Sequence, residues 1–265
     1  MSEKLNALIE VAKGEVAEIL VDEALPVLVG EMLRGTVLEA ATEAAGVVMP
    51  GVGHIMLSYK QKKLEKNFEL YISKIIEYQD EINRRLGMLE EAQRFVIKTE
   101  YFGLIADYAS QTKQEEKIDL IVNGFINIAG NVLPQKDSIL MYYDTLDQLT
   151  MLDLRVLRVY IHSSHLEDEG GETISDIMKA YDLDFSQMEM IKEKLARLGL
   201  LESKNDVDMD ENIRNMAQYL EEVSKGKKNP KLKHLKRISK SESYRLTPYG
   251  RKLHSFFAEV IHKEE

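Results

Sequence analysis

Apolar residues recur at every third or fourth position along most of this 265-residue chain. That spacing places them on one face of an α-helix, whereas a half-buried strand would alternate apolar and polar residues. Proline and glycine, which interrupt helices, are scarce, with 5 and 15 copies. Apolar residues make up 44% of the chain, which is enough to build a core. The sequence therefore predicts a mostly α-helical protein.

Residues 1–149 are expected to form a helical domain of long amphipathic helices. A helix over 3–34 is interrupted near Pro26, and the "MPGVG" turn near residue 50 closes a small apolar hairpin. A long amphipathic helix follows this turn, then at least two helices within 88–131 and another over about 138–149. The apolar stripe of the long helix consists of Leu57, Leu64, Phe68, Tyr71, Ile72, Ile75, Ile76 and Ile82.

The apolar hairpin raises the question of a membrane. Residues 35–57 are long enough to span a bilayer. However, Glu39 and Glu43 interrupt the stretch, and a charge at the bilayer centre costs about 3 kcal/mol on insertion scales. We therefore predict a packed hairpin and consider membrane contact unexpected. A membrane-active effector that uses residues 47–57 is the alternative.

Residues 150–265 carry a series of helix start and stop signals. Three pairs have the spacing of a capping box: Thr150 with Asp153, Thr173 with Asp176, and Ser186 with Glu189. Gly199 is expected to end the third of these helices in the left-handed conformation. The stretch "LLES" then reads as a strand that pairs with "YRL", and Thr247-Pro248 begins a last helix. The third helix should bury Met188, Ile191, Leu195 and Leu198.

The stretches "KLARLGLLES" and "YRLTPYGRKL" resemble the recognition helix, two wing strands and closing helix of the winged-helix family. The resemblance implies a C-terminal winged-helix domain with a two-stranded β wing over 150–265. An insertion over 204–243, with its own helix at about 210–224, is longer than the family's usual wing. In this family the recognition helix enters the major groove of DNA. Carried onto this chain, the residues that would face the groove are Gln187, Lys192, Lys194 and Arg197.

Positive charge is concentrated in the insertion and just after it. The formal net charge is −10, yet residues 225–252 contain eleven Lys and Arg against the single Glu242, so that window carries +10 and the rest −20. A solvated lysine-rich loop would have the same composition. If about five of these cations contacted phosphate, log affinity would fall with log salt with a slope of about −4 to −5. The expected backbone contacts are Lys227, Lys228, Lys231, Lys233, Lys236, Arg237, Lys240 and Arg245.

No motif of an enzyme is present in the sequence. There is no cysteine and no phosphate-binding loop of the Gly-x-x-x-x-Gly-Lys-Ser/Thr type. The stretch "DVDMDENI" lacks the glycine and the last glutamate of a calcium loop. His162 and His165 are expected to lie in a solvated turn and not in a metal site. We therefore expect a non-enzymatic protein without cofactor or metal, located in the cytoplasm because its N-terminus is no secretory signal.

The N-terminal half is similar in layout to abortive-infection proteins of the alpha family. The similarity involves the apolar hairpin, the helices that follow it, and a helix with Leu146, Leu149, Asp153 and Leu157 at matching positions. It implies a bacterial phage-defence or prophage setting. The expected partners are nucleic acid, DNA more than RNA, and a second copy bound through the N-terminal helices. A module that docks proteins and binds no nucleic acid remains the alternative.

Overall fold

The computed structural model describes residues 52–130, 135–162, 171–239 and 243–258. The chain divides into two compact units, which are described separately: residues 1–148 with 256–265, and residues 149–255. The predicted helix over 3–34 and the apolar hairpin near residue 50 lie outside the described residues. Within them the fold is mostly helical with one two-stranded antiparallel sheet, so the predicted α-rich class is confirmed.

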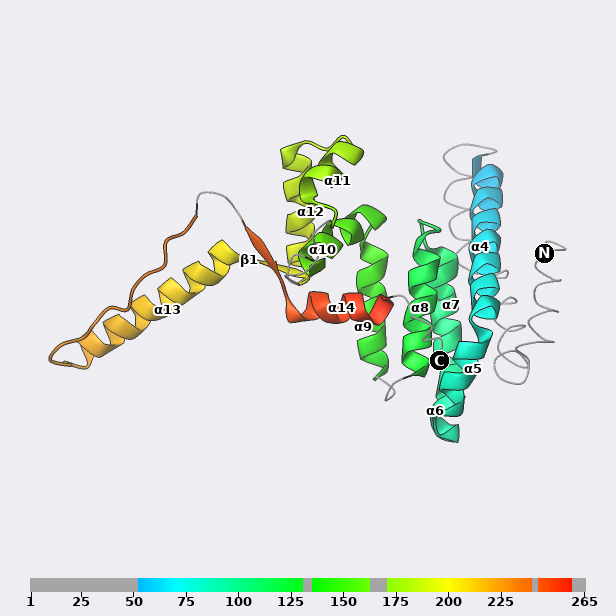
Figure 1. Ribbon diagram of the computed structural model, residues 1–265, viewed down its shortest axis with the longest axis horizontal. Coiled ribbons are helices and arrows are strands. Elements are labelled where there is room, and N and C mark those ends of the chain that lie inside the picture. Colours follow the sequence, from blue (N-terminus) through cyan, green and yellow to red (C-terminus); the bar gives the residue numbers. More distant parts are fainter. Residues whose placement is uncertain (1–51, 131–134, 163–170, 240–242, 259–265) are drawn as a thin grey trace. The chain divides into compact units, whose positions relative to one another are not determined.

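The first unit is built from consecutive helices (Figure 1). The predicted long helix is divided at Tyr78, where α4 gives way to α5. The elements are α4 (Val52–Glu77), α5 (Gln79–Gly87), α6 (Glu91–Val96), the π-helical turn η1 (Ile97–Tyr101), α7 (Phe102–Gln111), α8 (Lys117–Ala129) and α9 (Lys136–Gln148).

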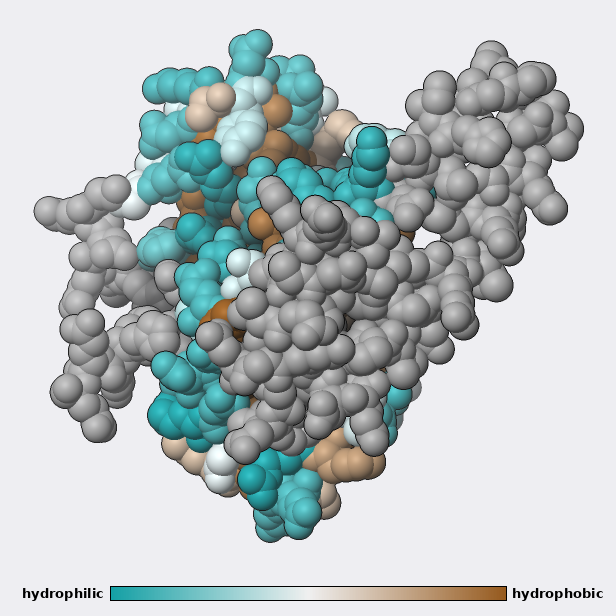
Figure 2. Space-filling model, turned by 90° about the vertical axis from the view of Figure 1, so that its right-hand side faces the viewer, coloured by the Kyte–Doolittle hydropathy of each residue, from teal (hydrophilic) through white to brown (hydrophobic). Residues whose placement is uncertain are grey.

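The core of the first unit contains the apolar stripe that the sequence predicted for α4 and α5. Phe68, Tyr71, Ile72, Ile75 and Ile82 are all buried. Tyr71 also lies 5.8 Å from the ring of Phe102 on α7, which joins two helices in one aromatic row. Figure 2 shows hydrophilic side chains over much of the described surface in its view, as expected when apolar stripes face inward.

Apolar residues before and after η1 differ in burial. Phe95 on α6 is 65% exposed, whereas Ile105 on α7 is buried. The π-helical turn η1 separates them. Because a π-helical turn holds more residues than an α-helical one, it shifts the faces of the helices on its two sides relative to each other.

One buried charged group of the first unit, the ammonium of Lys117, is satisfied by backbone carbonyls. The buried ammonium of Lys117 donates to the carbonyl oxygens of Leu146 at 2.9 Å and Asp147 at 3.1 Å, which lie at the C-terminal end of α9. A cation at this end also interacts favourably with the helix dipole. The buried Lys117 therefore caps the C-terminal end of α9.

The second unit contains the small sheet and the helices around it. Strand pairing follows the register Leu201 with Leu246, Glu202 with Arg245, and Ser203 with Tyr244, which confirms the predicted pairing. Helix α14 ends in residues 256 and 257, which belong to the first unit. The elements are α10 (Met151–His162), α11 (Ile174–Ala180), α12 (Phe185–Arg197), β1 (Leu201–Ser203), α13 (Lys204–Ser224), β2 (Tyr244–Leu246) and α14 (Pro248–Phe257).

Two of the three predicted capping boxes are confirmed. The Thr150 and Thr173 hydroxyls accept hydrogen bonds from the backbone N–H of Asp153 and Asp176, at 3.1 and 3.2 Å, and the carboxylates accept in return.

The third predicted box, of Ser186 with Glu189, is wrong. Asp184 caps α12 instead, accepting from the N–H of Gln187 at 2.7 Å, while the Gln187 side chain accepts from the N–H of Asp184 at 2.9 Å. Asp184 has the extended backbone that an N-cap requires and an acceptor on a short side chain, so the helix starts before Ser186.

The end of α12 and the start of α14 are joined by a compact set of contacts. Gly199 has φ +72°, as predicted, and turns the chain from α12 toward β1. The N–H of Thr247 donates to the carbonyl of Leu200 at 3.1 Å, and the Thr247 hydroxyl accepts from the N–H of Gly250 at 2.9 Å. Thr247 therefore caps α14, as predicted, and fixes its first turn against Leu200.

Candidate nucleic-acid interface

The insertion between the two strands is an arm made of α13 and an extended segment. Helix α13 begins directly after β1, six residues before the predicted start at about 210. Ser203 caps it by accepting from the N–H of Asp206 at 3.1 Å. The predicted start was later because residues 204–208 form no apolar stripe. The Ser203 cap accounts for the earlier start, together with Asp206 in the first turn. The negative charge of Asp206 interacts favourably with the positive end of the helix dipole.

Residues 225–239, which we call the return segment, are bound to α13 by two asparagines. The amide of Asn212 donates to the carbonyl of Lys236 at 2.8 Å and accepts from its N–H at 2.7 Å. Asn205 makes the same pair of bonds with Ser239, at 3.1 and 3.0 Å. The later asparagine, Asn212, binds the earlier residue of the segment, so the return segment runs antiparallel to α13. Asn205 and Asn212 were not singled out in the sequence.

Some of the basic residues in the arm are paired with acids of α13. The Lys236 ammonium lies 2.8 Å from carboxylate oxygens of both Asp208 and Glu211, and Lys227 lies 2.9 Å from Glu222. The hydrogen bond to Asp208, followed by that to Glu211, raises the pKa of Lys236. These two lysines, both predicted to contact phosphate, therefore already have carboxylate partners.

Four other predicted contacts are exposed and carry uncompensated charge. Lys228, Lys231, Lys233 and Arg237 form no ion pair with any part of the chain that the structure describes. The return segment contains seven Lys and Arg and no acid. The predicted contact Lys240 lies outside the described residues. A cleft of about 290 Å³ runs along the arm and is lined by Asn215, Gln218, Tyr219, Glu222, Lys227, Asn229, Lys231 and Lys233.

The predicted groove residues on α12 are mostly engaged within the protein. Lys192 lies 2.7 Å from Glu189 on the same helix. Lys194 lies 2.5 Å from the buried carboxylate of Asp153 on α10. Gln187 is exposed but belongs to the helix cap, and Arg197 is exposed. Of these four, only Arg197 presents a charge to solvent without a carboxylate beside it among the described residues.

The last predicted backbone contact, Arg245, lies on the sheet. Its guanidinium is 2.9 Å from the Glu202 carboxylate on the neighbouring strand. This cross-strand pair is half-exposed on the arginine side, so it contributes little to stability.

The arm projects away from α12 within the second unit. Figure 1 shows α13 extending away from α10, α11 and α12 within the second unit. The sequence predicted groove contacts on the third helix and backbone contacts in the insertion. The candidate interface is instead the arm, with its four free cations on the return segment.

A second cleft of about 450 Å³ lies beside the sheet. It brings together residues from α10, β1, α13, β2 and α14, which no local sequence pattern relates. Burial raises the pKa of Tyr160 in this cleft to about 12, so its hydroxyl stays protonated at neutral pH. The lining consists of Tyr160, Glu202, Lys204, Tyr244, Arg245, Leu246, Pro248 and Arg251, of which only Arg245 was predicted as a contact.

Across residues 52–258 with their gaps, no group of three or more histidines and acids is placed to hold a metal ion. Asp206, Asp208 and Asp210 belong to α13, so they form no calcium loop. No helix among the described residues is both long and apolar enough to cross a bilayer. Of the proposed membrane segment 47–57, residues 52–57 form the start of α4, and residues 47–51 lie outside the described part.

Comparison with known proteins yields no relative. Neither the family models, nor the curated proteins, nor the solved structures contain a match to this chain. The assignment of the arm as the candidate interface therefore rests on its charges and geometry.

Proposed function

We propose that this chain is a non-enzymatic protein that binds nucleic acid through the return segment of its projecting arm. The observation that carries the proposal is the group of four exposed cations, Lys228, Lys231, Lys233 and Arg237, on a segment that contains no acid. Phosphate contacts supply most of the affinity in sequence-independent binding, and each releases condensed counterions.

The acids of α13 explain why the arm holds its shape without a partner. Asp208, Glu211 and Glu222 neutralise Lys227 and Lys236, and Asn205 and Asn212 bind the backbone. The remaining cations are therefore presented along a segment that is already ordered. Preorganised groups lose less conformational entropy on binding than groups on a flexible tail. This favours binding by the return segment over the solvated-loop alternative.

The order of elements in the second unit supports a winged-helix arrangement as part of the proposal. Three helices, α10, α11 and α12, are followed by an antiparallel strand pair and then by α14. In that arrangement the arm is an extended wing, and wings contact the phosphate backbone in complexes of this family. The engaged lysines of α12 make it a weaker candidate for base contacts than the sequence suggested.

Fluorescence anisotropy with a labelled DNA duplex, measured over a series of salt concentrations, tests the proposal. Four phosphate contacts predict a slope of log affinity against log salt of about −3 to −4. Replacing Lys228, Lys231, Lys233 and Arg237 by glutamine should lower the affinity at low salt by roughly tenfold or more and bring the slope toward zero. An RNA duplex of equal length shows whether DNA is preferred.

The matched control neutralises four other exposed lysines of the chain. Lys62, Lys113, Lys179 and Lys252 lie outside the arm and are exposed, so their replacement by glutamine changes the net charge equally. It should leave most of the affinity intact. Equal losses in both variants, or no binding by the unmodified chain at low salt, would contradict the proposal.

A further inference from the structure

The arm carries an apolar stripe that faces solvent. Met209, Ile213, Met216, Leu220 and Val223 lie on α13 and are between 46% and 62% exposed. No residue of this 21-residue helix is buried. Isolated exposed apolar residues are normal, but a continuous row of five on a projecting helix marks an interaction surface.

The spacing of the stripe identifies the kind of surface that fits it. The intervals from Met209 to Val223 are four, three, four and three residues. This is the 3.5-residue repeat at which two α-helices pack side chains into each other along a coiled-coil seam. A flat or irregular partner surface would not require that repeat. The occupant of the stripe is therefore another helix with the same periodicity.

We propose that the occupant is α13 of a second copy of this chain, packed antiparallel. In a symmetric pair both copies contribute the same stripe, so the apolar side chains of one copy contact the apolar side chains of the other. The proposal is independent of nucleic-acid binding, because it uses the apolar stripe and not the cations of the return segment.

Charge decides the direction of the pair. Near the N-terminal end of α13, Asp206 and Asp210 form no ion pair among the described residues, whereas Asp208 and Glu211 pair with Lys236. At the other end, Lys225 and Lys227 pair with Glu221 and Glu222, and Lys228, just past the helix, forms no ion pair within the described part of the chain. A parallel pair would bring the acidic ends of both copies together. An antiparallel pair places the acidic end of each beside the basic end of the other, where the charges attract.

The return segment leaves the stripe accessible. The asparagines that bind it, at 205 and 212, lie on a flank of the helix next to the stripe, and the stripe itself stays exposed with the return segment in place. Two copies can therefore pair along α13 while Lys231 and Lys233 still face solvent. Such a dimer would present two basic segments at once.

The contact area predicts a weak, reversible dimer. Five half-exposed side chains offer on the order of 100 Å² each, or about 500 Å² from each copy. A standard stable interface buries about 800 Å² from each partner, and specific interfaces begin at about 1,000 Å² in total. The pair lies at that lower limit, so we expect a monomer–dimer equilibrium that depends on concentration.

Sedimentation of the full chain over about a hundred-fold concentration range tests the proposal. The average mass should rise from that of the monomer toward that of the dimer. The double variant Ile213→Asp, Leu220→Asp should remain monomeric throughout. Gln218→Asp, on the opposite face of α13, serves as control and should dimerise as the unmodified chain does. An unmodified chain that stays monomeric, or a dimer that survives the double variant, would overturn the proposal.

Cross-linking tests the direction, and the chain is suited to it because it has no cysteine. Met209→Cys and Val223→Cys are prepared as separate chains, mixed, and treated with a short bifunctional maleimide. An antiparallel pair predicts cross-links between the two different chains. Cross-links formed only between identical chains would show a parallel pair. Failure to form any cross-link between copies of the chain would show that the stripe has a different occupant. Circular dichroism of each variant checks that α13 remains helical.

Discussion

The ammonium of Lys194 lies 2.5 Å from the carboxylate of Asp153, a residue that is almost fully buried. Asp153 also accepts hydrogen bonds from the N–H and hydroxyl of Thr150. One carboxylate therefore caps α10 and fixes α12 to it. Since the lysine is needed to compensate a buried charge, Lys194 is first of all a structural residue of the second unit, although the sequence suggested a base contact.

Replacing Lys194 by alanine should destabilise the second unit. The change leaves the Asp153 carboxylate buried with fewer partners, which costs about 1–3 kcal/mol of unfolding free energy. Chemical denaturation followed by circular dichroism measures the loss. Arg197→Ala, one turn further along α12 and exposed, is the matched control and should change the unfolding free energy little. Equal stability of the two variants would show that the ion pair contributes nothing.

Removing the amide of Asn212 should free the return segment. Asn212→Ala deletes both hydrogen bonds to the Lys236 backbone, and the segment then keeps the bonds of Asn205 and its ion pairs with α13. Hydrogen exchange at the Lys236 amide should become faster by about tenfold or more, because the segment opens more often. Gln218→Ala removes a neighbouring amide that makes no such bonds and should leave this exchange unchanged. Slow exchange at Lys236 in the Asn212 variant would contradict the assignment.

Gly250 should not tolerate a side chain. A Cβ atom at this position would lie 2.4 Å from the carbonyl oxygen of Leu200, a backbone atom that cannot move alone. Gly250→Ala should therefore lower the unfolding free energy by about 1–3 kcal/mol, despite the better helix propensity of alanine. At Gly171 no atom lies within 4 Å of the added Cβ, so Gly171→Ala serves as control. A Gly250→Ala protein as stable as the control would contradict the close approach.

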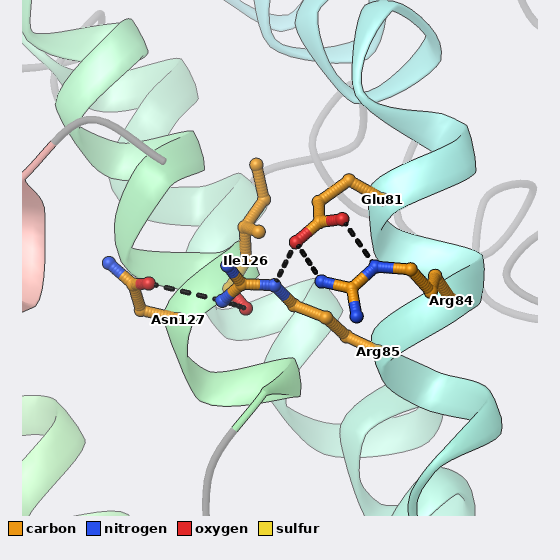
Figure 3. A network of polar contacts seen from close by, with 5 residues as sticks. All are labelled: Glu81, Arg84, Arg85, Ile126 and Asn127. Carbon is orange, nitrogen blue, oxygen red and sulfur yellow. Dashed lines mark hydrogen bonds and ion pairs between the residues drawn. The ribbon is translucent and has the colours of Figure 1, made fainter. Parts of the chain in front are cut away.

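Acid should destabilise the first unit through Glu81. Its carboxylate binds Arg84 and Arg85, and Arg85 also donates to the carbonyl of Ile126 on α8 (Figure 3). The hydrogen bond from Arg84, with that from Arg85, lowers the pKa of Glu81 from 4.5 to about 2. Because the folded-state pKa is depressed, the stabilisation is complete above the unfolded pKa and is lost as the pH falls from about 5 to about 2.

The expected loss is about 1–2 kcal/mol, since Arg84 is partly exposed to solvent and its contribution is screened. Unfolding free energies of the unmodified chain and of Glu81→Gln, measured between pH 7 and pH 3, test this. The variant should be less stable at neutral pH and should lose less stability in acid. Parallel pH profiles for the two proteins would exclude this role for Glu81.

The sequence by itself determined much of the local structure, although it placed the cap of α12 at Ser186 instead of Asp184. Helical periodicity places Phe68, Tyr71 and Ile72 inward, and the threonines at 150, 173 and 247 start helices because each side chain bonds a backbone N–H only three residues away. The strand pair was also predictable from its flanking signals, because Gly199 turns the chain into one strand and Thr247 follows the other.

Only the tertiary structure decided which charges are available to a partner. The sequence treats Lys194 and Lys236 like any other cations, yet each has a carboxylate beside it. The partner of Lys194 is 41 residues away and that of Lys236 is 28 residues away. Charge pairing across such separations depends on how the chain returns on itself, and composition and periodicity do not encode that path. The same holds for the exposure of the apolar stripe on α13, because a pattern of spacing fixes a helix face and only packing decides whether that face is covered.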